Sequence, residues 1–295
     1  ATVLNSYGMD ETQRATISAD YTHDTPLVIA DRMEAKVFYT RLNRNEHTEQ
    51  LLNDGVDDLY RVSDMGFDQE IWGADLQFGL TRNWAAMIHE FTYGLTADYT
   101  ETSRPRYRTE TNLTTSTSSN YFPFNDETFP NKNFPDTETT TAGFYVQDSI
   151  TAGRFGITPA LRFDYYNLKP HPDALTANAS SGTIPVSDRT ETELSPKLGI
   201  TFDVTEEYKI FGQYAHGFRA PPYDNANFAY SNPGYGYEIL PNPDLGPETS
   251  DGFETGLRGR FRDGSSFSIS GFYNIYDDFI EAVQIAAGPP QQLQY

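Results

Sequence analysis

The sequence predicts an all-β fold, an antiparallel β-barrel that spans a membrane. Apolar and polar residues alternate with a period of two in many segments, which is typical of strands that separate two unlike environments. In the segment 208–218, Tyr208, Ile210 and Tyr214 share one face, and Lys209 lies on the other. A strand with an apolar side toward lipid and a polar side toward water is the repeating unit of a barrel wall in a bilayer.

The composition agrees with this fold class and excludes others. The 295 residues include 20 Tyr, 20 Phe and no Cys, and the formal net charge is −21. The absence of Cys excludes disulfides and thiolate metal sites. The acidity argues against a nucleic-acid partner, because phosphate binding requires a basic surface. The chain has no apolar run of roughly 18 residues or more, the length that a transmembrane helix needs.

The alternating pattern predicts about ten strands. Where such a strand leaves the membrane for water, its apolar face becomes polar, as happens toward the end of the segment 33–48. The predicted strands are 12–21, 33–48, 66–80, 84–99, 140–150, 154–166, 194–204, 208–218, 253–262 and 266–280.

The connections between these strands fall into two classes. Short turns are expected at 81–83, 151–153, 205–207 and 263–264. Long loops are expected at 49–65, 104–139, 168–190 and 220–248. Outer-membrane barrels keep short turns on the periplasmic side, so we expect the long loops to share the extracellular face. The loop 104–139 is rich in Thr, Ser and Asn, and we expect no regular structure in it.

Two short boxes flank the last long loop. The first box is Phe218-Arg219-Ala220-Pro221, and the second is Asn242-Pro243-Asp244-Leu245, followed by Pro247-Glu248-Thr249. The pair resembles the FRAP and NPNL boxes of the TonB-dependent haem receptors of the bacterial outer membrane. The branch of haem, haemoglobin, transferrin and lactoferrin receptors is the most similar. The second box departs slightly from the family pattern, because it reads Asn-Pro-Asp-Leu.

The resemblance implies an integral protein of a Gram-negative outer membrane, surrounded by lipid. Its family has a barrel of about 22 strands with an N-terminal plug inside. The predicted strands account for about ten of these and for no plug. We therefore expect residues 1–295 to be an internal part of the barrel, and a complete ten-stranded barrel is the alternative. TonB would act through the missing plug region.

The resemblance also implies a function. The expected activity is uptake of haem iron, or of haem from a haem-carrying protein, by a TonB-dependent receptor. A receptor for a ferric siderophore is one alternative, and a passive channel or adhesin barrel is another of a different class. Haem would be the transported ligand, and no catalytic cofactor is expected.

Catalytic and calcium-binding roles are not expected. The sequence has no Gly-x-Ser-x-Gly elbow, no His-Glu-x-x-His motif and no Gly-rich phosphate loop, so it does not indicate an enzyme. The acidic clusters at 54–58 and 126–127 lack the spacing of an EF-hand, which favours a solvated acidic rim over a Ca²⁺ site.

In this sequence, tyrosine is the residue type expected to ligate haem iron. The resembling receptors carry an extracellular ligand between the two boxes, often His, paired with a second ligand from the plug. No His lies between the boxes here, but four tyrosines do: Tyr223, Tyr230, Tyr235 and Tyr237. A tyrosinate is one of the axial ligands of haem iron, and a nearby cation such as Arg219 would help the phenol to ionise. No metal is expected beyond such a haem-iron tyrosinate.

Tyr235 and Tyr237 are the favoured ligand candidates. The flanking glycines of the Gly-Tyr-Gly-Tyr turn would let a flat macrocycle approach the backbone. Packing is the alternative role for each tyrosine, because aromatic residues crowd the rims and loops of barrels. The missing His would also fit a receptor that takes its substrate from a host protein, or one that binds a siderophore.

Two further residues are candidates for ligand contact. His171, held between Pro170 and Pro172, suits haem capture, or it is an ordinary surface residue of its loop. Arg219 shares its face with the inward charges, so it could pair with a haem propionate or with a plug carboxylate. Pro221 ends the strand because it cannot donate to a ladder. The boxes therefore either frame a variable loop or contact the ligand directly.

Overall fold

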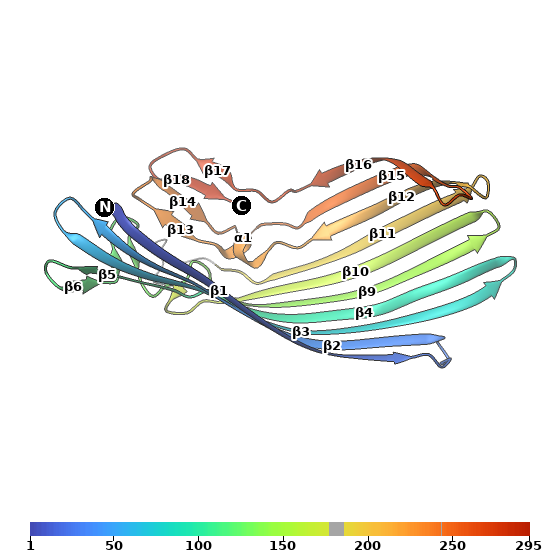
Figure 1. Cartoon of the computed structure of the whole chain (residues 1–295), viewed down its shortest axis with the longest axis horizontal. Helices are drawn as coiled ribbons and strands as arrows, with labels where there is room; N and C mark the ends of the chain where they lie inside the picture. The colour runs from blue at the N-terminus through green and yellow to red at the C-terminus, as the bar shows by residue number, and fades with distance from the viewer. Residues whose placement is uncertain (177–185, 243) are drawn as a thin grey trace.

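The computed structural model describes residues 1–176, 186–242 and 244–295, and nearly all the regular structure in them is β. A 12-stranded antiparallel sheet dominates the fold. Its main path follows chain order as β1-β2-β3-β4-β9-β10-β11-β12-β15-β16, with β5 and β6 beside β3 off this path (Figure 1). No helix in the described ranges is long and apolar enough to cross a membrane.

The elements of the sheet have the following bounds. The main path consists of β1 (Thr2–His23), β2 (Arg32–Asn53), β3 (Asp58–Trp84), β4 (Met87–Ser103), β9 (Asp136–Ala152), β10 (Phe155–His171), β11 (Arg189–Asp203), β12 (Tyr208–Arg219), β15 (Glu248–Arg260) and β16 (Ser266–Asp277). The loops contain β5 (Arg106–Asn112), β6 (Thr117–Ser119), β7 (Tyr121–Phe122), β8 (Glu127–Thr128), α1 (Tyr223–Asn227), β13 (Tyr230–Asn232), β14 (Tyr237–Leu240), β17 (Val283–Ala286) and β18 (Gln291–Gln294). Each predicted strand overlaps one strand of the main path, so the all-β antiparallel fold is confirmed.

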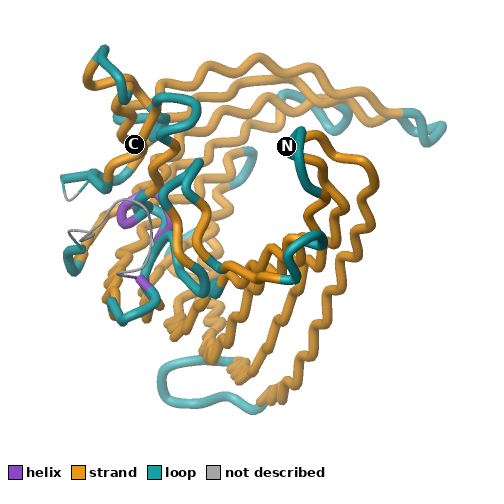
Figure 2. The backbone as a smooth tube through the Cα atoms, turned by 90° about the vertical axis from the view of Figure 1, so that its left-hand side faces the viewer, coloured by secondary structure: helices purple, strands orange, loops and turns teal. Residues whose placement is uncertain are grey.

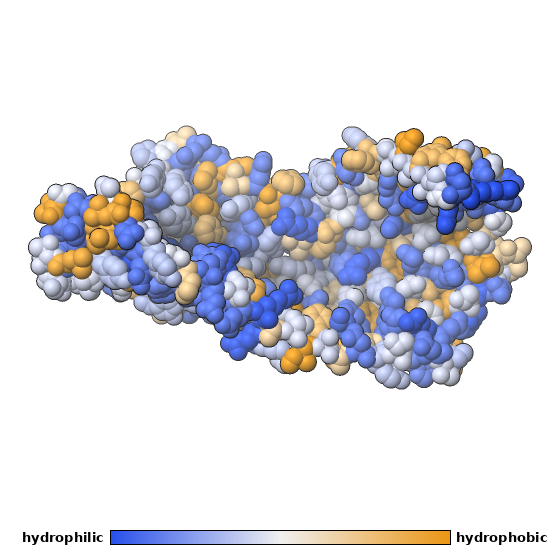
Figure 3. Space-filling model, viewed as in Figure 1, coloured by the Kyte–Doolittle hydropathy of each residue, from blue (hydrophilic) through white to orange (hydrophobic). Residues whose placement is uncertain are grey.

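The strands form a curved wall beside an open interior (Figure 2). On the apolar face, Tyr39 lies directly opposite Trp72, and their ring centroids are 4.3 Å apart. Tyr214 and Phe253 form a second such pair at 5.1 Å. Trp72 is 57% exposed, as expected for a ring that lipid would cover. The residues that line the hollow visible in Figure 3 are mainly hydrophilic.

On the polar face, large side chains lie along the wall. The Tyr145 hydroxyl crosses Gly94 and donates to Gln77 Oε1 at 2.9 Å. The Arg162 guanidinium crosses Gly143 in the same manner to reach β4. A Cβ atom at either glycine would overlap the side chain that crosses it. These two positions therefore require glycine because of close approach.

The prediction of a turn at 81–83 is wrong, because the turn lies further along the chain. Strand β3 continues to Trp84, which pairs with Met87, and the chain reverses at Ala85 and Ala86. Ala85 has φ 57°, a conformation for which tight hairpins normally use Gly, Asn or Asp. The turn carries no such residue, so the sequence gives no signal at its true position. The turns expected at 151–153, 205–207 and 263–264 lie close to the observed ends of β9, β11 and β15.

The prediction of a loop at 49–65 is also wrong, because most of this segment belongs to strands β2 and β3. Strands β2 and β3 stay paired up to Asn53 and Asp58. The connection is short, and Asp54 Oδ1 accepts the backbone N–H groups of Val56 and Asp57 at 2.9 and 2.8 Å. Both faces of this extension carry polar residues, so the period of two disappears while the backbone pairing continues.

The segment expected at 104–139 without regular structure contains strands. Strand β5 pairs with β3 from Arg106 opposite Met65 to Asn112 opposite Leu59. The hairpin of β7 and β8, residues 121–128, follows it. The loops that connect the strands at this end lie opposite the short turns, as Figure 1 shows for β5, β13 and β14 on its left.

Candidate ligand site at the loop end of the sheet

The two boxes meet across the ladder of β12 and β15. Phe218 lies opposite Thr249, and Arg219 lies opposite Glu248. Arg219 Nη1 is 2.9 Å from Glu248 Oε2, and Glu248 Oε1 accepts the backbone N–H of Ile280 at 2.7 Å. The cation that the sequence offered for a propionate or a plug carboxylate therefore has a partner within its own chain.

Other box residues hold the loop to the sheet. Pro221 is fully buried, and its carbonyl oxygen accepts the Tyr166 hydroxyl at 3.0 Å. Leu245 is buried with Leu168 and Ala226 in a small apolar cluster. Ala220, between Arg219 and this cluster, is half-buried. These contacts are those of a frame around the loop.

Asn242 acts as a junction between three segments. Its Oδ1 accepts the Asp244 N–H at 3.0 Å, and its Nδ2 donates to the Tyr295 carbonyl oxygen at 2.5 Å. Its own carbonyl oxygen accepts Arg189 Nη2 at 3.2 Å. Pro243 lies outside the described residues. The second box thus also makes framing contacts.

Tyr223, on α1, is packed in the loop core. Its ring lies 5.3 Å from that of Phe134 in an edge-on arrangement, and it contacts the cluster of Leu168, Ala226 and Leu245. Burial raises the pKa of Tyr223 to about 12. A phenol held in its neutral form is a poor ligand for ferric iron, so the structure favours packing at this position.

Tyr235 lies at the tip of the β13–β14 hairpin and is 76% exposed. Its ring meets that of Phe124 edge-on at 5.5 Å. A Cβ atom at Gly234 would overlap the Phe124 ring, so the flat group that approaches this glycine belongs to the chain itself. Gly236, with φ +70°, has open space where a Cβ would stand. The free approach is therefore on the Gly236 side of Tyr235.

Tyr230 and Tyr237 stand on adjacent strands of the same hairpin. Their ring centroids are 6.0 Å apart, and Asn232 Nδ2 donates to the Tyr230 hydroxyl at 3.3 Å. Burial and then the charge of Glu127 raise the pKa of Tyr230, and the charge of Arg106 partly offsets them. Arg106 is thus a cation whose charge acts on a loop tyrosine.

His171 lies among carboxylates. It pairs with Asp136 in the register of β10 and β9, and its Nε2 is 3.2 Å from Glu138 Oε1. It lines a hollow with Glu70 and Glu101, and its side chain is 53% exposed. Within the described ranges, no group of three or more His, Asp or Glu residues is arranged to hold a metal ion. The structure does not bring His171 together with the loop tyrosines.

Sequence reasoning missed a group of arginines at this end. Arg106 and Arg108 of β5 stack on Phe129 with guanidinium carbons 5.1 and 5.0 Å from the ring centre. Arg61 of β3 lies 5.3 Å from the centre of Phe122. The available signal was the alternation Arg104-Pro-Arg106-Tyr-Arg108, a pattern that also occurs at Arg258-Gly-Arg260-Phe-Arg262. Its meaning depends on the β3–β5 pairing, which the sequence did not reveal.

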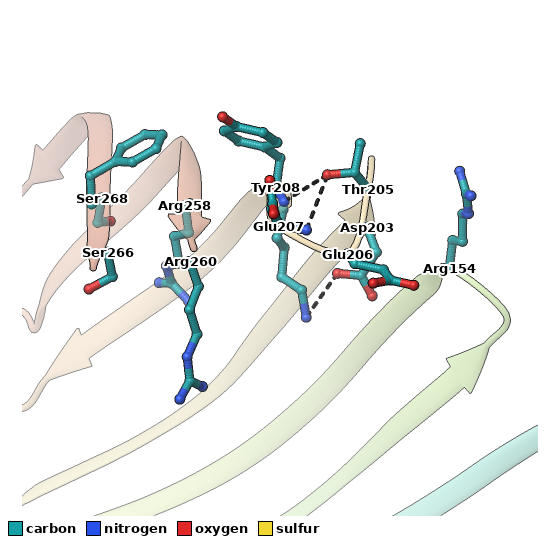
Figure 4. Close-up of a pocket in the computed structure, with 13 residues that line it drawn as sticks. Arg154, Asp203, Thr205, Glu206, Glu207, Tyr208, Arg258, Arg260, Ser266 and Ser268 are labelled. Atoms are coloured by element: carbon teal, nitrogen blue, oxygen red, sulfur yellow. Dashed lines mark hydrogen bonds and ion pairs between the residues drawn. The ribbon is translucent and has the colours of Figure 1, made fainter. Parts of the chain in front are cut away.

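A cavity of about 820 Å³ lies at the other, short-turn end of the sheet. It is lined by residues around the β11–β12 turn and by β15 and β16. Arg258 and Arg260 extend to one side of the sheet and Tyr208 to the other, and Lys209 Nζ lies 3.2 Å from Asp203 Oδ1 (Figure 4). None of the candidate residues from the sequence lines this cavity.

The curved antiparallel wall, apolar on one face and polar on the other, with short turns at one end and long loops at the other, is that of an outer-membrane β-barrel protein. The family is more specific. The chain matches the model of the TonB dependent receptor-like, beta-barrel family over residues 2–295. It therefore belongs to this family of outer-membrane transport receptors.

Curated relatives match shorter parts of the chain. The hemoglobin-haptoglobin utilization protein B of Neisseria meningitidis serogroup C is 31% identical over 130 residues, which is 43% of this chain and 16% of the relative. The hemoglobin and hemoglobin-haptoglobin-binding protein B of Haemophilus influenzae is 32% identical over 98 residues, which is 33% of this chain and 9% of the relative. The chain thus matches less than a fifth of either protein's length.

Solved structures share the fold. The hemophore receptor HasR of Serratia marcescens was solved as a double mutant with its hemophore HasA and heme. It aligns with a TM-score of 0.62 at 15% identity, and the alignment covers 97% of this chain and 49% of the HasR chain. The ferric citrate transporter FecA aligns with a TM-score of 0.61 at 18% identity, and the alignment covers 90% of this chain and 35% of the FecA chain. At such identities the likeness concerns the fold alone.

Proposed function

We propose that the chain is part of a TonB-dependent receptor that takes up haem, either free or from a haem-carrying protein. The sequence similarity to proteins named for haemoglobin and haemoglobin-haptoglobin carries this proposal. The paired boxes that frame a tyrosine-rich loop support it. The ligand would bind at the loop end, and coupling to TonB would act through a plug.

The barrel would be completed by further strands. Within the described residues, β1 and β16 are the two edges of the main sheet and do not pair with each other. Unpaired edges cannot persist in a bilayer, because their backbone groups would lack partners there. Residues 1–295 therefore contribute one section of a larger closed barrel, consistent with their match to about half of the HasR chain, 49%.

Tyr235 is the tyrosine that we propose as iron ligand, with Tyr237 as the second choice. Tyr235 is exposed, and the space beside Gly236 is open. Tyr230 would line the site, whereas buried Tyr223 would serve packing. His171 stays a candidate for a first capture contact at the rim, and Arg219 would keep the frame in place.

A haemin titration of the complete receptor in detergent tests this function. We expect a saturable Soret change with the high-spin spectrum of a tyrosinate complex, lost in Tyr235→Phe and kept in the matched control Tyr223→Phe. If this spectrum is lost in Tyr237→Phe instead, the iron ligand is Tyr237, two residues further along the hairpin. If the wild-type receptor shows no saturable spectral change, haem uptake is contradicted. Binding of a ferric siderophore would then be the function to test.

A further inference from the structure

Three arginines gather beneath the β7–β8 hairpin at the loop end. Two of them have an acidic partner: Arg61 Nη2 is 2.7 Å from Glu110 Oε2, and Arg106 Nη1 is 2.7 Å from Glu127 Oε1. Arg108 has a single hydrogen bond to a side chain among the described residues, from its Nε to Ser63 Oγ at 2.9 Å. Its terminal nitrogens are therefore available to a further acceptor.

Arg108 differs from the other cations that lack an ion pair. Arg14, Arg154 and Arg260 are exposed to solvent, whereas Arg108 is partly buried. Its guanidinium carbon lies 5.4 Å from the centre of the Phe122 ring and 5.0 Å from that of Phe129. Burial and the charges of Arg106 and Arg61 lower the pKa of Arg108. A half-buried cation beside two others is costly unless an anion neutralises it.

Glu127 is the anion that faces this group, and it is incompletely satisfied. Its side chain is fully buried at 0% exposure, and Oε1 binds Arg106. Its second oxygen, Oε2, is buried and has no hydrogen-bond partner within the part of the chain that the structure describes. Arg108 gains electrostatic stabilisation from the Glu127 charge, but no hydrogen bond joins the two among the described contacts. An orphan carboxylate oxygen is thus held in the same place as a guanidinium with free nitrogens.

The element that carries Glu127 is a short hairpin whose base is anchored by buried Phe122 and by the bond from the Phe129 N–H to the Asn120 carbonyl oxygen. Strands β7 and β8 pair only through Tyr121 with Thr128 and Phe122 with Glu127. The hairpin is tied to the tyrosine loop, because Gly234 N–H donates to the Phe124 carbonyl oxygen at 3.1 Å. Movement of Glu127 and movement of the candidate ligand loop are therefore mechanically linked.

We propose that Arg106 and Arg108 form a binding site for an acidic group of the transported ligand, and that Glu127 occupies this site in the ligand-free chain. This inference rests on the proposed function, in which the acidic group is a haem propionate. The ligand carboxylate would replace Glu127 at Arg106 Nη1, which also donates to the side-chain oxygens of Asn131 and Asn133, and it would bind the free nitrogens of Arg108. The β7–β8 hairpin would carry Glu127 outward as the ligand enters.

The test compares haemin with haemin dimethyl ester, which has the same ring and iron but no propionate charge. Both are titrated into the complete receptor in detergent, in wild type and in Arg108→Gln, Glu127→Gln and the matched control Arg61→Gln. Arg61 stacks on the same hairpin but has its own partner, Glu110. Heat-modifiable migration on gels verifies that each variant is folded.

We expect wild type to bind haemin about ten- to a hundredfold more tightly than the ester, the range for a charge-assisted hydrogen-bonded pair. Arg108→Gln should greatly reduce this preference, leaving only the part that Arg106 supplies, and Arg61→Gln should keep it. Glu127→Gln should tighten haemin binding, because the internal competitor loses its charge.

The possible failures are distinguishable. Equal affinities for haemin and the ester in wild type would overturn the site while leaving haem uptake intact, and this comparison needs no mutant. Weaker haemin binding in Glu127→Gln would show that Glu127 is structural and overturn its role as occupant. If neither compound binds wild type, the proposed function itself fails.

Discussion

Arg219 and Glu248 join the two sequence boxes through an ion pair of 2.9 Å between directly opposed residues of β12 and β15. Glu248 also accepts the N–H of Ile280 with its other oxygen. One carboxylate therefore links the start of the loop, its end and the segment that follows β16.

The two partners of this ion pair should differ in their effect on stability. Arg219 is 63% exposed, so Arg219→Gln should lower the free energy of unfolding by no more than about 1 kcal/mol. Glu248→Ala should cost more, about 1–3 kcal/mol, because the Ile280 N–H also loses its acceptor. Urea unfolding of the receptor in detergent measures both changes. Equal losses would show that the bond to Ile280 contributes little.

Gly234→Ala should disturb the tip of the tyrosine loop. The added Cβ would overlap the Phe124 ring, so one of the two hairpins must shift, at a cost of about 1–3 kcal/mol. Faster limited proteolysis of the 121–128 and 230–240 hairpins would report it. The double variant with Phe124→Ala should recover wild-type resistance. If the single variant is as resistant as wild type, the two hairpins are not interlocked.

The loop that carries Phe129 should loosen in acid. Lys132, buried with a side-chain exposure of 6%, bonds Asp136 and Asp173 at 2.7 and 2.8 Å. Burial tends to raise the pKa of Asp173, but the bonds from Lys132 and Thr176 outweigh it, and the net pKa is lowered. A lowered carboxyl pKa gives stability that is present above the unfolded value of 3.8 and is lost as pH falls through the folded value.

Hydrogen exchange of residues 129–136 should therefore accelerate as the pH is lowered from about 5 to about 3, after correction for the intrinsic rate. In Asp173→Asn this acceleration should be smaller, because part of the titrating contact is already gone. An identical pH profile in the variant would exclude Asp173 as its source.

Substitutions on the two faces of β10 should differ sharply. Leu161 lies on the apolar face and is 40% exposed, and the adjacent Ala160 faces the interior opposite Lys197. Leu161→Arg should destabilise the folded receptor in lipid vesicles by about 2–4 kcal/mol if it lies near the bilayer centre, and Ala160→Arg by far less. The free energy of unfolding from vesicles tests this. The reverse order would mean that the faces are assigned incorrectly.

The sequence predicted the part of the fold that lies in the membrane. There, one face of each strand meets lipid and the other meets the polar interior. Apolar and polar residues therefore alternate along the strand, and this period of two is visible in the sequence. At the loop end, as in residues 43–53 of β2, both faces meet water, so backbone pairing continues without a pattern to reveal it. The reversal at Ala85 was missed because Ala is not a turn signal.

The candidate site was predictable only in outline. The boxes located the loop, and the structure adds that Arg219, Pro221 and Asn242 make framing contacts within the chain. The arginine group was not predictable, because Arg108 meets Ser63 only after β5 pairs with β3. Contacts between segments far apart in a polar sequence leave no local signature.

Two glycines of the polar face let long side chains lie close to the wall. Because Tyr145 lies flat across Gly94 and Arg162 across Gly143, these long groups run along the wall instead of projecting from it. The polar face thus keeps these hydrogen-bonding and charged groups close to the backbone. A bulkier residue at Gly94 or Gly143 would push a tyrosine or a guanidinium away from the wall and into the interior.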